Sequence, residues 1–168
     1  MRNFALALFA LVLSVPAFAQ KSSHADMANQ GICYQQAKQV VDLIAADDTK
    51  YSKTHDEPGR VSYGTAQLDG AHYDSASKTC YVKWSRMMFS TYPSFSSMFF
   101  TVIVADAFEG KDIATFHGDD VRQETGGDFV EETPVTCQVN GTQCDSRAQF
   151  NGLLWKLIPA FRPVNAHN

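Results

Sequence analysis

The stretch TCQVNGTQCDSRAQF, residues 136–150, places two cysteines symmetrically about an Asn-Gly pair and then runs into a helical pattern. Asn-Gly between short strand-forming runs is the strongest local signal for a two-residue β-hairpin loop. Counting outward from this pair sets Cys137 opposite Cys144 at a hydrogen-bonded position of the ladder, where Cα atoms lie about 5.5 Å apart, within disulfide range. We therefore predict a hairpin closed by a Cys137–Cys144 disulfide.

Metal binding and redox exchange are the alternatives for this cysteine pair. Zinc would require further Cys or His ligands at knuckle spacing, and the nearest histidine is His117. A redox C-x-x-C motif is absent from the sequence. A structural disulfide is therefore the preferred interpretation.

The other two cysteines fall in segments with different periodicity. From Ile32 to Ala46 apolar residues recur at helical spacing, and Cys33 belongs to that apolar face. Around Cys80 the apolar residues alternate, so Cys80, Val82 and Trp84 share one face of a strand. Once the hairpin pair is assigned, Cys33 and Cys80 are left for each other. We expect a Cys33–Cys80 disulfide that joins the helix to this strand.

Residues 1–19 have the layout of a secretory signal peptide. One positive charge precedes an apolar run over residues 4–15, and Ala17-Phe18-Ala19 has the form of a cleavage site. The run is shorter than the about 20 residues that a membrane-spanning helix needs. We expect cleavage before Gln20, a single mature domain over 20–168, and a periplasmic or secreted location without a membrane anchor.

Charge and motifs limit the function classes. The chain has 14 Lys+Arg and 18 Asp+Glu, a formal net charge of −4, and no basic cluster. This disfavours nucleic acid and anionic membranes as partners, because both are bound by clustered cations. No P-loop, G-x-G-x-x-G or G-x-S-x-G motif occurs, so we expect no cofactor.

The remaining segments predict an antiparallel sheet and a second helix. Ser146 and Gln149 form a capping box before an apolar stripe, and Pro159 predicts a helix end near Ile158. The order helix, strands, helix predicts an α+β fold, with about four to six antiparallel strands, both helices on one face, and disulfide cross-links. We expect strands at 61–68, at 71–73, around Cys80, from Thr101, and through Ile113 and Phe116. The connections between them are a polar segment over 47–60, turns at 74–78 and 108–110, and an acidic surface loop over 118–134. The apolar stripe of the second helix consists of Phe150, Leu153, Leu154, Leu157 and Phe161.

Three motifs carry a resemblance: HYDSASKTCYV (72–82), DAFEGK (106–111) and PVTCQVNGTQCDSRAQF (134–150). Together they resemble an uncharacterised family of small exported bacterial proteins, over the last two-thirds of the chain. The resemblance implies bacterial export and one compact domain, and it implies no active-site residue because these motifs are structural. The Met- and aromatic-rich stretch 87–100 departs from that family, whose members tend to be polar there.

Four residues are candidates for a polar site. His72 and His117 each precede nearby carboxylates and could act as a general base or metal ligand. Asp106 and Glu109 flank the DAFEG turn and could form a carboxylate pair. The competing interpretation makes both histidines ordinary strand residues, leaves Glu109 exposed, and has Asp106 bond the backbone of the turn. We favour that interpretation, since no motif defines the geometry of a site.

We predict no metal site, after weighing two alternatives. Acidic residues over 119–128 could surround Ca²⁺, but their spacing does not match the EF-hand loop. Met87, Met88 and Met98 could be Cu(I) ligands, yet they lack dense repetition, and methionines that fill core gaps are commoner.

The stretch 87–100 also suggests a binding loop. Phe89, Tyr92 and Phe95 surround Pro93 and are interspersed with serines. An exposed apolar patch rimmed by serine marks an interaction surface, whereas alternation toward Val102 favours a strand. We predict a non-enzymatic binding module that contacts a protein or an apolar ligand. The alternative is a small hydrolase that uses a His/carboxylate site.

Overall fold

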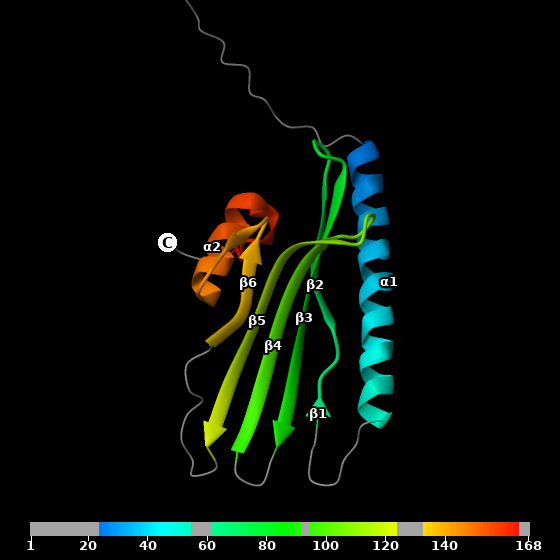
Figure 1. Ribbon diagram of the computed structural model, residues 1–168. Coiled ribbons are helices and arrows are strands. Elements are labelled where there is room, and N and C mark those ends of the chain that lie inside the picture. Colours follow the sequence, from blue (N-terminus) through cyan, green and yellow to red (C-terminus); the bar gives the residue numbers. More distant parts are fainter. Residues whose placement is uncertain (1–23, 55–61, 92–94, 124–132, 165–168) are drawn as a thin grey trace, which may run out of the picture.

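The computed structural model describes residues 24–54, 62–91, 95–123 and 133–164 (Figure 1). Within these ranges the chain forms two α-helices, seven strands and one short 3-10 helix, in the order that the sequence predicts. The elements are α1 (His24–Thr54), β1 (Ser62–Tyr63), β2 (Gln67–Asp74), β3 (Thr79–Thr91), β4 (Phe95–Asp106), β5 (Lys111–Gln123), β6 (Thr133–Val139), β7 (Thr142–Gln143), α2 (Arg147–Leu157) and the 3-10 helix η1 (Pro159–Phe161).

The strands form one antiparallel sheet in the order β1-β3-β4-β5-β6-β7, and β2 also pairs with β3. Ser62 pairs with Ser90 near one end of β3, whereas β2 pairs with β3 from Ser85 to Thr79. β1 and β2 therefore share one position beside β3. A Cβ atom on Gly64, between them, would overlap the Met87 carbonyl. The predicted α+β fold, with a helix near each end of the chain packed on an antiparallel sheet, is confirmed.

The two helices cover opposite faces of the sheet, which corrects the expectation of one shared face. In β4, Ile103 and Ala105 pack with the α1 residues, whereas Val102 and Val104 pack with the α2 residues. α1 lies along β2 and β3, and α2 lies near β6 (Figure 1). A central strand that is apolar on both faces gives no indication of which face each helix covers.

α1 begins earlier and ends later than the predicted helix over 32–46, and it includes the first part of the predicted connection over 47–60. Its contact stripe continues beyond the apolar residues as polar side chains. Near one end Gln30 bonds to β2, and near the other Asp48 bonds to β3. Hydrophobic spacing alone misses both ends, because these contacts are hydrogen bonds.

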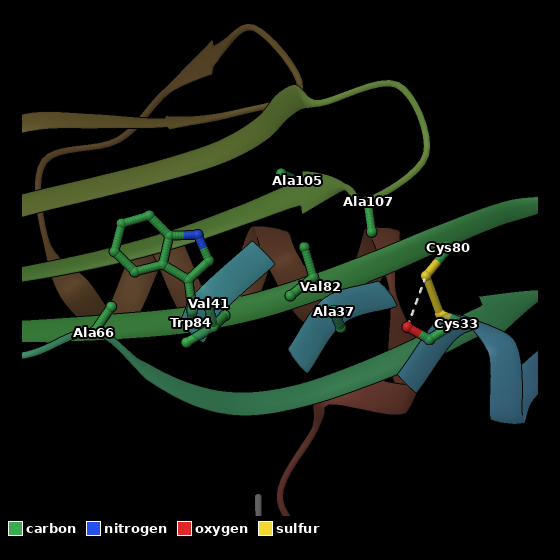
Figure 2. Close-up of a cluster of buried hydrophobic side chains, with 9 residues drawn as sticks. All are labelled: Cys33, Ala37, Val41, Ala66, Cys80, Val82, Trp84, Ala105 and Ala107. Atoms are coloured by element: carbon green, nitrogen blue, oxygen red, sulfur yellow. Dashed lines mark hydrogen bonds between the residues drawn. A yellow bond between two sulfur atoms is a disulfide. The ribbon is translucent and has the colours of Figure 1, made fainter. Parts of the chain in front are cut away.

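The first core cluster lies between α1 and the sheet (Figure 2). The Cys33–Cys80 disulfide joins the two layers, as predicted, with Cα atoms 5.4 Å apart. Both cysteines are fully buried, and Trp84 closes the cluster further along β3. Its buried members are Cys33, Ala37, Val41, Ala66, Cys80, Val82, Trp84, Ala105 and Ala107.

The second core cluster lies between α2 and the opposite face. Ser146 Oγ accepts a hydrogen bond from the Gln149 N–H at 3.3 Å, so Ser146 caps the helix. The Gln149 side chain accepts from the Asp145 N–H, one residue before the position that a standard capping box uses. The buried members of this second cluster are Val102, Val104, Ala114, Phe116, Cys137, Val139, Phe150, Leu154 and Ile158.

The end of α2 differs from the predicted stripe in one residue. Leu157 is 39 % exposed, whereas Ile158 is 2 % exposed. The helix ends at Leu157, as the following Pro159 predicts, and Ile158 leaves helical geometry at φ −131°. Because the backbone leaves helical geometry at Ile158, this side chain is buried in the core in place of Leu157.

The Cys137–Cys144 hairpin is confirmed. Gln138 pairs with Gln143 and Val139 with Thr142, and the Cys144 N–H donates to the Cys137 carbonyl at 3.0 Å. Asn140 and Gly141 both have positive φ, 48° and 79°, as a type I′ turn requires. The disulfide joins Cα atoms 5.0 Å apart.

β5 extends into the predicted acidic loop. Residues 118–123 belong to β5, and β6 begins at Thr133, so the loop over 118–134 is wrong at both ends, while 124–132 lie outside the described residues. Gly118 pairs with Phe100 and Asp119 with Phe99. Pairing with β4 overrides the low strand propensity of Gly and Asp, because strand preference depends on neighbours.

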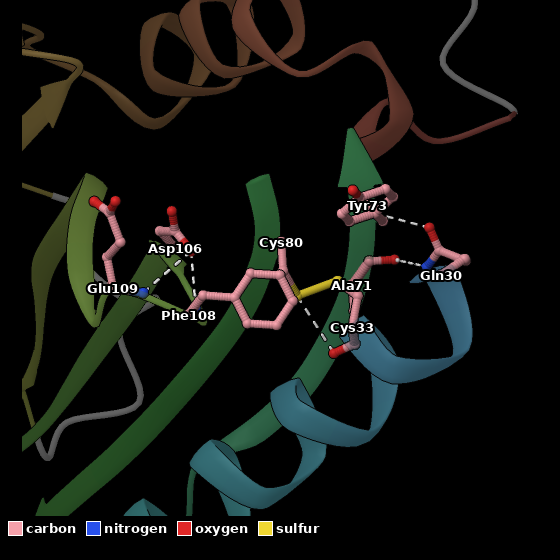
Figure 3. Close-up of a disulfide and its surroundings, with 8 residues drawn as sticks. All are labelled: Gln30, Cys33, Ala71, Tyr73, Cys80, Asp106, Phe108 and Glu109. Carbon is pink, nitrogen blue, oxygen red and sulfur yellow. Dashed lines mark hydrogen bonds between the residues drawn. A yellow bond between two sulfur atoms is a disulfide. The ribbon is translucent and has the colours of Figure 1, made fainter. Parts of the chain in front are cut away.

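Both edges of the sheet carry features that discourage further strand pairing. On β2, Gln30 Nε2 donates to the Ala71 carbonyl at 3.1 Å, and the Tyr73 N–H donates to Gln30 Oε1 at 2.8 Å (Figure 3). On the other side β7 covers the end of β6, which also includes Pro134. Proline has no N–H to offer an added strand.

Within the described ranges, no helix is long and apolar enough to cross a membrane.

Candidate functional site

The two candidate histidines lie on opposite faces of the sheet. His72 pairs with Tyr81, which packs with the α2 cluster. His117 pairs with Thr101, which in turn pairs with Arg86, the residue that bonds to α1. Partners in register share a face of the sheet. One concave pocket therefore cannot hold both imidazoles, and the two must be considered separately.

His72 lines a pocket of about 290 Å³ at the edge of β2. Asp74, its nearest carboxylate along the strand, is occupied by the β2–β3 turn. It accepts from the Ser77 hydroxyl at 2.7 Å and from the Ala76 N–H at 3.0 Å. These two bonds, the Ser77 hydroxyl first, hold the pKa of Asp74 below its ordinary value. A carboxylate committed to the turn is poorly placed to orient a general base on His72.

Lys83 also lines the pocket beside His72 and carries a positive charge. Its Nζ lies 3.8 Å from Asp69 Oδ2, and Asp69 Oδ1 accepts from the Ser85 hydroxyl at 2.9 Å. Gly70 lies opposite Lys83 in the register, and a Cβ there would lie 3.5 Å from the Phe161 ring of η1. The pocket thus lies beside an existing ion pair.

His117 is bonded to a hydroxyl. Its Nδ1 lies 2.7 Å from Thr101 Oγ1, and its ring stacks on Phe99 at a centroid distance of 6.1 Å. Thr101 is 6 % exposed, so a substrate would have little access to its oxygen. Within the described residues no carboxylate bonds to the imidazole. The pair is typical of a cross-strand contact.

Asp106 and Glu109 have the roles that the structural interpretation gave them. Asp106 Oδ1 accepts from the Phe108 N–H at 2.8 Å and from the Glu109 N–H at 3.3 Å (Figure 3). Asp106 is 9 % exposed, and Glu109 is exposed. The turn over 107–110 follows directly from this bonding. Both residues line a larger pocket, of about 470 Å³, at this end of the sheet.

The ion pair of Arg86 and Asp48 was not predicted. Arg86 Nη1 donates to Asp48 Oδ1 at 2.7 Å, and the Ala66 N–H donates to Asp48 Oδ2 at 3.1 Å. The side chains are 28 % and 13 % exposed, so the contact joins α1 to the sheet in a partly dry setting. The ion pair could have been predicted from helical spacing, because Asp48 follows Val41 and Ile44 on the same face of α1.

The predicted binding stretch belongs to a long β3–β4 hairpin. Phe89 lies in β3 and Phe95 in β4, and Tyr92 lies outside the described residues, as do 93 and 94. Whether these three aromatic side chains bind a partner stays a prediction. The described neighbours that share this part of the hairpin are large and apolar; we call them the Met/Phe arm: Met87, Met88, Met98, Phe99 and Phe100.

Both faces of the Met/Phe arm carry apolar side chains. Met87 pairs with Phe100, and Met88 pairs with Phe99, so the two pairs lie on opposite faces. Met87 is 39 % exposed, and the other members are partly exposed. The guanidinium of Arg147 lies over the Phe100 ring, 4.1 Å from its centre, so Arg147 partly covers one face of that ring.

Among the described residues, no group of three or more His, Cys, Asp or Glu side chains could hold a metal ion. Comparisons with protein-family models, with curated proteins and with solved structures found no match. The resemblance to small exported bacterial proteins accordingly stays a prediction.

Proposed function

We propose that this protein is an exported, non-enzymatic binding module that contacts a protein partner through the Met/Phe arm. The observation that carries the proposal is the 39 % exposure of Met87, opposite partly exposed Phe100, with Met88 and Phe99 on the reverse face. Clustered apolar side chains on a protein surface mark interaction sites. Methionine suits such surfaces, because its flexible thioether adapts to different shapes.

A protein fits this arm better than a small apolar ligand. A small ligand is normally enclosed by one concave surface, whereas the arm presents apolar side chains on both faces of a hairpin. A partner protein can contact both faces together. The edges of the sheet are less suitable, because Gln30 occupies backbone groups of β2 and Pro134 interrupts the donors of β6.

The hydrolase alternative lacks an assembled constellation. The two histidines lie on opposite faces, Asp74 uses both carboxylate oxygens in a turn, and Asp106 uses its Oδ1 in another. Catalysis by a general base requires that base, its orienting group and the substrate to lie within hydrogen-bond reach of one another.

Export to the periplasm or the cell exterior is part of the proposal. Two disulfides are typical of proteins in oxidising compartments. The predicted signal peptide, residues 1–19, lies outside the described residues, so its support is the sequence pattern alone.

A photo-crosslinking experiment tests the partner. A photoreactive residue replaces Met87 in the full chain, produced in cells that export it, and a matched variant carries the same residue at Leu43, which is 71 % exposed on α1. We expect a discrete cross-linked product from position 87 and none from position 43. A second replacement, Phe99→Gln, should weaken that product, because it removes an aromatic anchor.

Three results would contradict the proposal. Equal cross-linking from both positions would indicate contact without specificity. A small-molecule adduct at position 87, detected by intact mass, would replace the protein partner by an apolar ligand. Hydrolysis of an ester panel that is lost in His72→Ala or His117→Ala would favour the enzyme.

A further inference from the structure

The larger pocket lies where β5 separates from β6. It has a volume of about 470 Å³. Lys111 and Asp112 pair with β4, while the ladder between β5 and β6 begins at Ala114. The register of β4 and β5 shifts between Val104 and Ala105, which leaves Ile113 as an extra residue. Such a bulge bends a strand, and the bend opens a hollow between the DAFEG turn and the Asn-Gly turn.

The pocket has an excess of negative charge. Asp106, Glu109 and Asp112 line it together with a single cation, Lys111. Lys111 forms no ion pair with any acidic residue of the described part of the chain. The amide side chains of Gln138 and Asn140 complete the polar lining. This charge balance favours a cationic ligand.

Asp106 provides an acceptor that the fold does not use. The residue is 9 % exposed, and its Oδ1 accepts two backbone N–H groups of the turn. Its Oδ2 accepts no hydrogen bond from the described residues. This oxygen is reached by solvent, since it is not among the buried side-chain atoms that lack a hydrogen-bond partner. A ligand that brings an N–H donor with positive charge can form a charge-assisted hydrogen bond to it.

Tyr81 adds an aromatic wall beside this carboxylate. It pairs with Asp106 in the β3–β4 register, so the two side chains share a face of the sheet, and both line the pocket. A tyrosine ring attracts an ammonium or guanidinium group placed over its face. The pocket therefore combines an accessible carboxylate oxygen that the fold does not use, an aromatic ring and net negative charge.

We propose that this pocket binds a small organic cation, a primary ammonium or guanidinium group on an aliphatic stem. Its volume is within the range of about 300–1,000 Å³ usual for small-ligand sites. A bare metal ion fits less well, because the described residues offer no group of three metal ligands. The cation comes either from a free diamine or from a Lys or Arg side chain. This site is independent of the Met/Phe arm, and either proposal can fail alone.

The test is a titration of the oxidised full chain, followed by amide chemical shifts. The probes are putrescine and agmatine as free cations, and lysine blocked at both ends as a stand-in for a protein side chain. We expect shifts that saturate at Tyr81, Asp106 and Asn140. Tighter binding of blocked lysine would indicate that the site binds a side chain of a partner protein. Tighter binding of putrescine or agmatine would indicate that it binds a small molecule.

Matched variants distinguish a site from general attraction. Asp106→Asn keeps an oxygen for the turn but removes the charge, and should weaken binding by about tenfold or more. Asp145→Asn removes the same charge from an exposed residue outside the pocket and should change binding less than about twofold. Tyr81→Leu should weaken binding, because it removes the ring.

Several outcomes would overturn the proposal. These are no saturable shifts with any probe, equal weakening by the two asparagine variants, or the same shifts produced by CaCl₂ at equal ionic strength. If Asp106→Asn does not fold, Asp112→Asn takes its place, since Asp112 is exposed and also lines the pocket. Binding unchanged in Asp112→Asn would likewise count against the proposal.

Discussion

The α1 half and the α2 half of this protein are held together in different ways. The cluster beneath α1 consists mainly of small side chains, and four of its nine buried members are alanines. The cluster beneath α2 contains Phe116, Phe150, Leu154 and Ile158, with the two phenylalanine rings 5.6 Å apart. Large interlocking side chains bury more apolar area per contact than small ones.

The covalent and polar contacts compensate for this difference. The disulfide of the α1 half spans 47 residues of sequence, while the disulfide of the α2 half spans 7. α1 also bonds to the sheet through Gln30 and Asp48, near its two ends. α1 therefore depends on its cross-link and its polar contacts, whereas α2 depends on packing. Three experiments test that contrast.

Removing the disulfides should give the largest effect. The paired replacement of Cys33 and Cys80 by serine should lower the free energy of unfolding by ~4 kcal/mol, because the long loop restricts the unfolded chain most. The same change at Cys137 and Cys144 should cost ~2.5 kcal/mol. Urea unfolding of both variants measures the difference, and equal losses would contradict the dependence of α1 on its cross-link.

Truncating one core residue in each half should reverse the order. Leu154→Ala should cost about 3 kcal/mol, since Leu154 is fully buried among large neighbours. Val41→Ala should cost about 1.5 kcal/mol, because it removes two methyl groups from a cluster made mainly of small side chains. Thermal and urea unfolding of both variants check the prediction. A larger loss at Val41 would mean that α1 is held by packing after all.

Gln30→Ala should have the smallest and most local effect. It removes both side-chain bonds to the edge of β2, so amide exchange at Tyr73 should accelerate about tenfold, equivalent to about 1.4 kcal/mol. Gln35→Ala, an exposed residue of the same helix, is the control. Hydrogen exchange read by NMR separates this local opening from global unfolding. Unchanged protection of Tyr73 would show that α1 shields the strand without that bond.

Individual residues show how much of the candidate sites was predictable. The turn role of Asp106 followed from its place in DAFEG, since an Asp side chain readily bonds the backbone two residues on. The separation of His72 from His117 did not, because strand parity is known only once each strand has a register. The pocket beside Asp106 depends on a bulge at Ile113. The sequence around Ile113 contains no turn residue or glycine that would have predicted this bulge.

Short-range rules predicted the local features of this protein: the Asn-Gly hairpin with its Cys137–Cys144 disulfide, the cap at Ser146, and an α+β order of elements. Positive φ, capping and periodicity involve only neighbouring residues. The Cys33–Cys80 pair followed by elimination once the hairpin pair was assigned. Three features could be read only from the folded chain: the helices lie on opposite faces, α1 spans His24–Thr54, and β5 continues to Gln123. Each of these depends on contacts between distant segments. Where a strand is apolar on both faces, or where a polar side chain supplies the contact, hydrophobic pattern does not distinguish the alternatives.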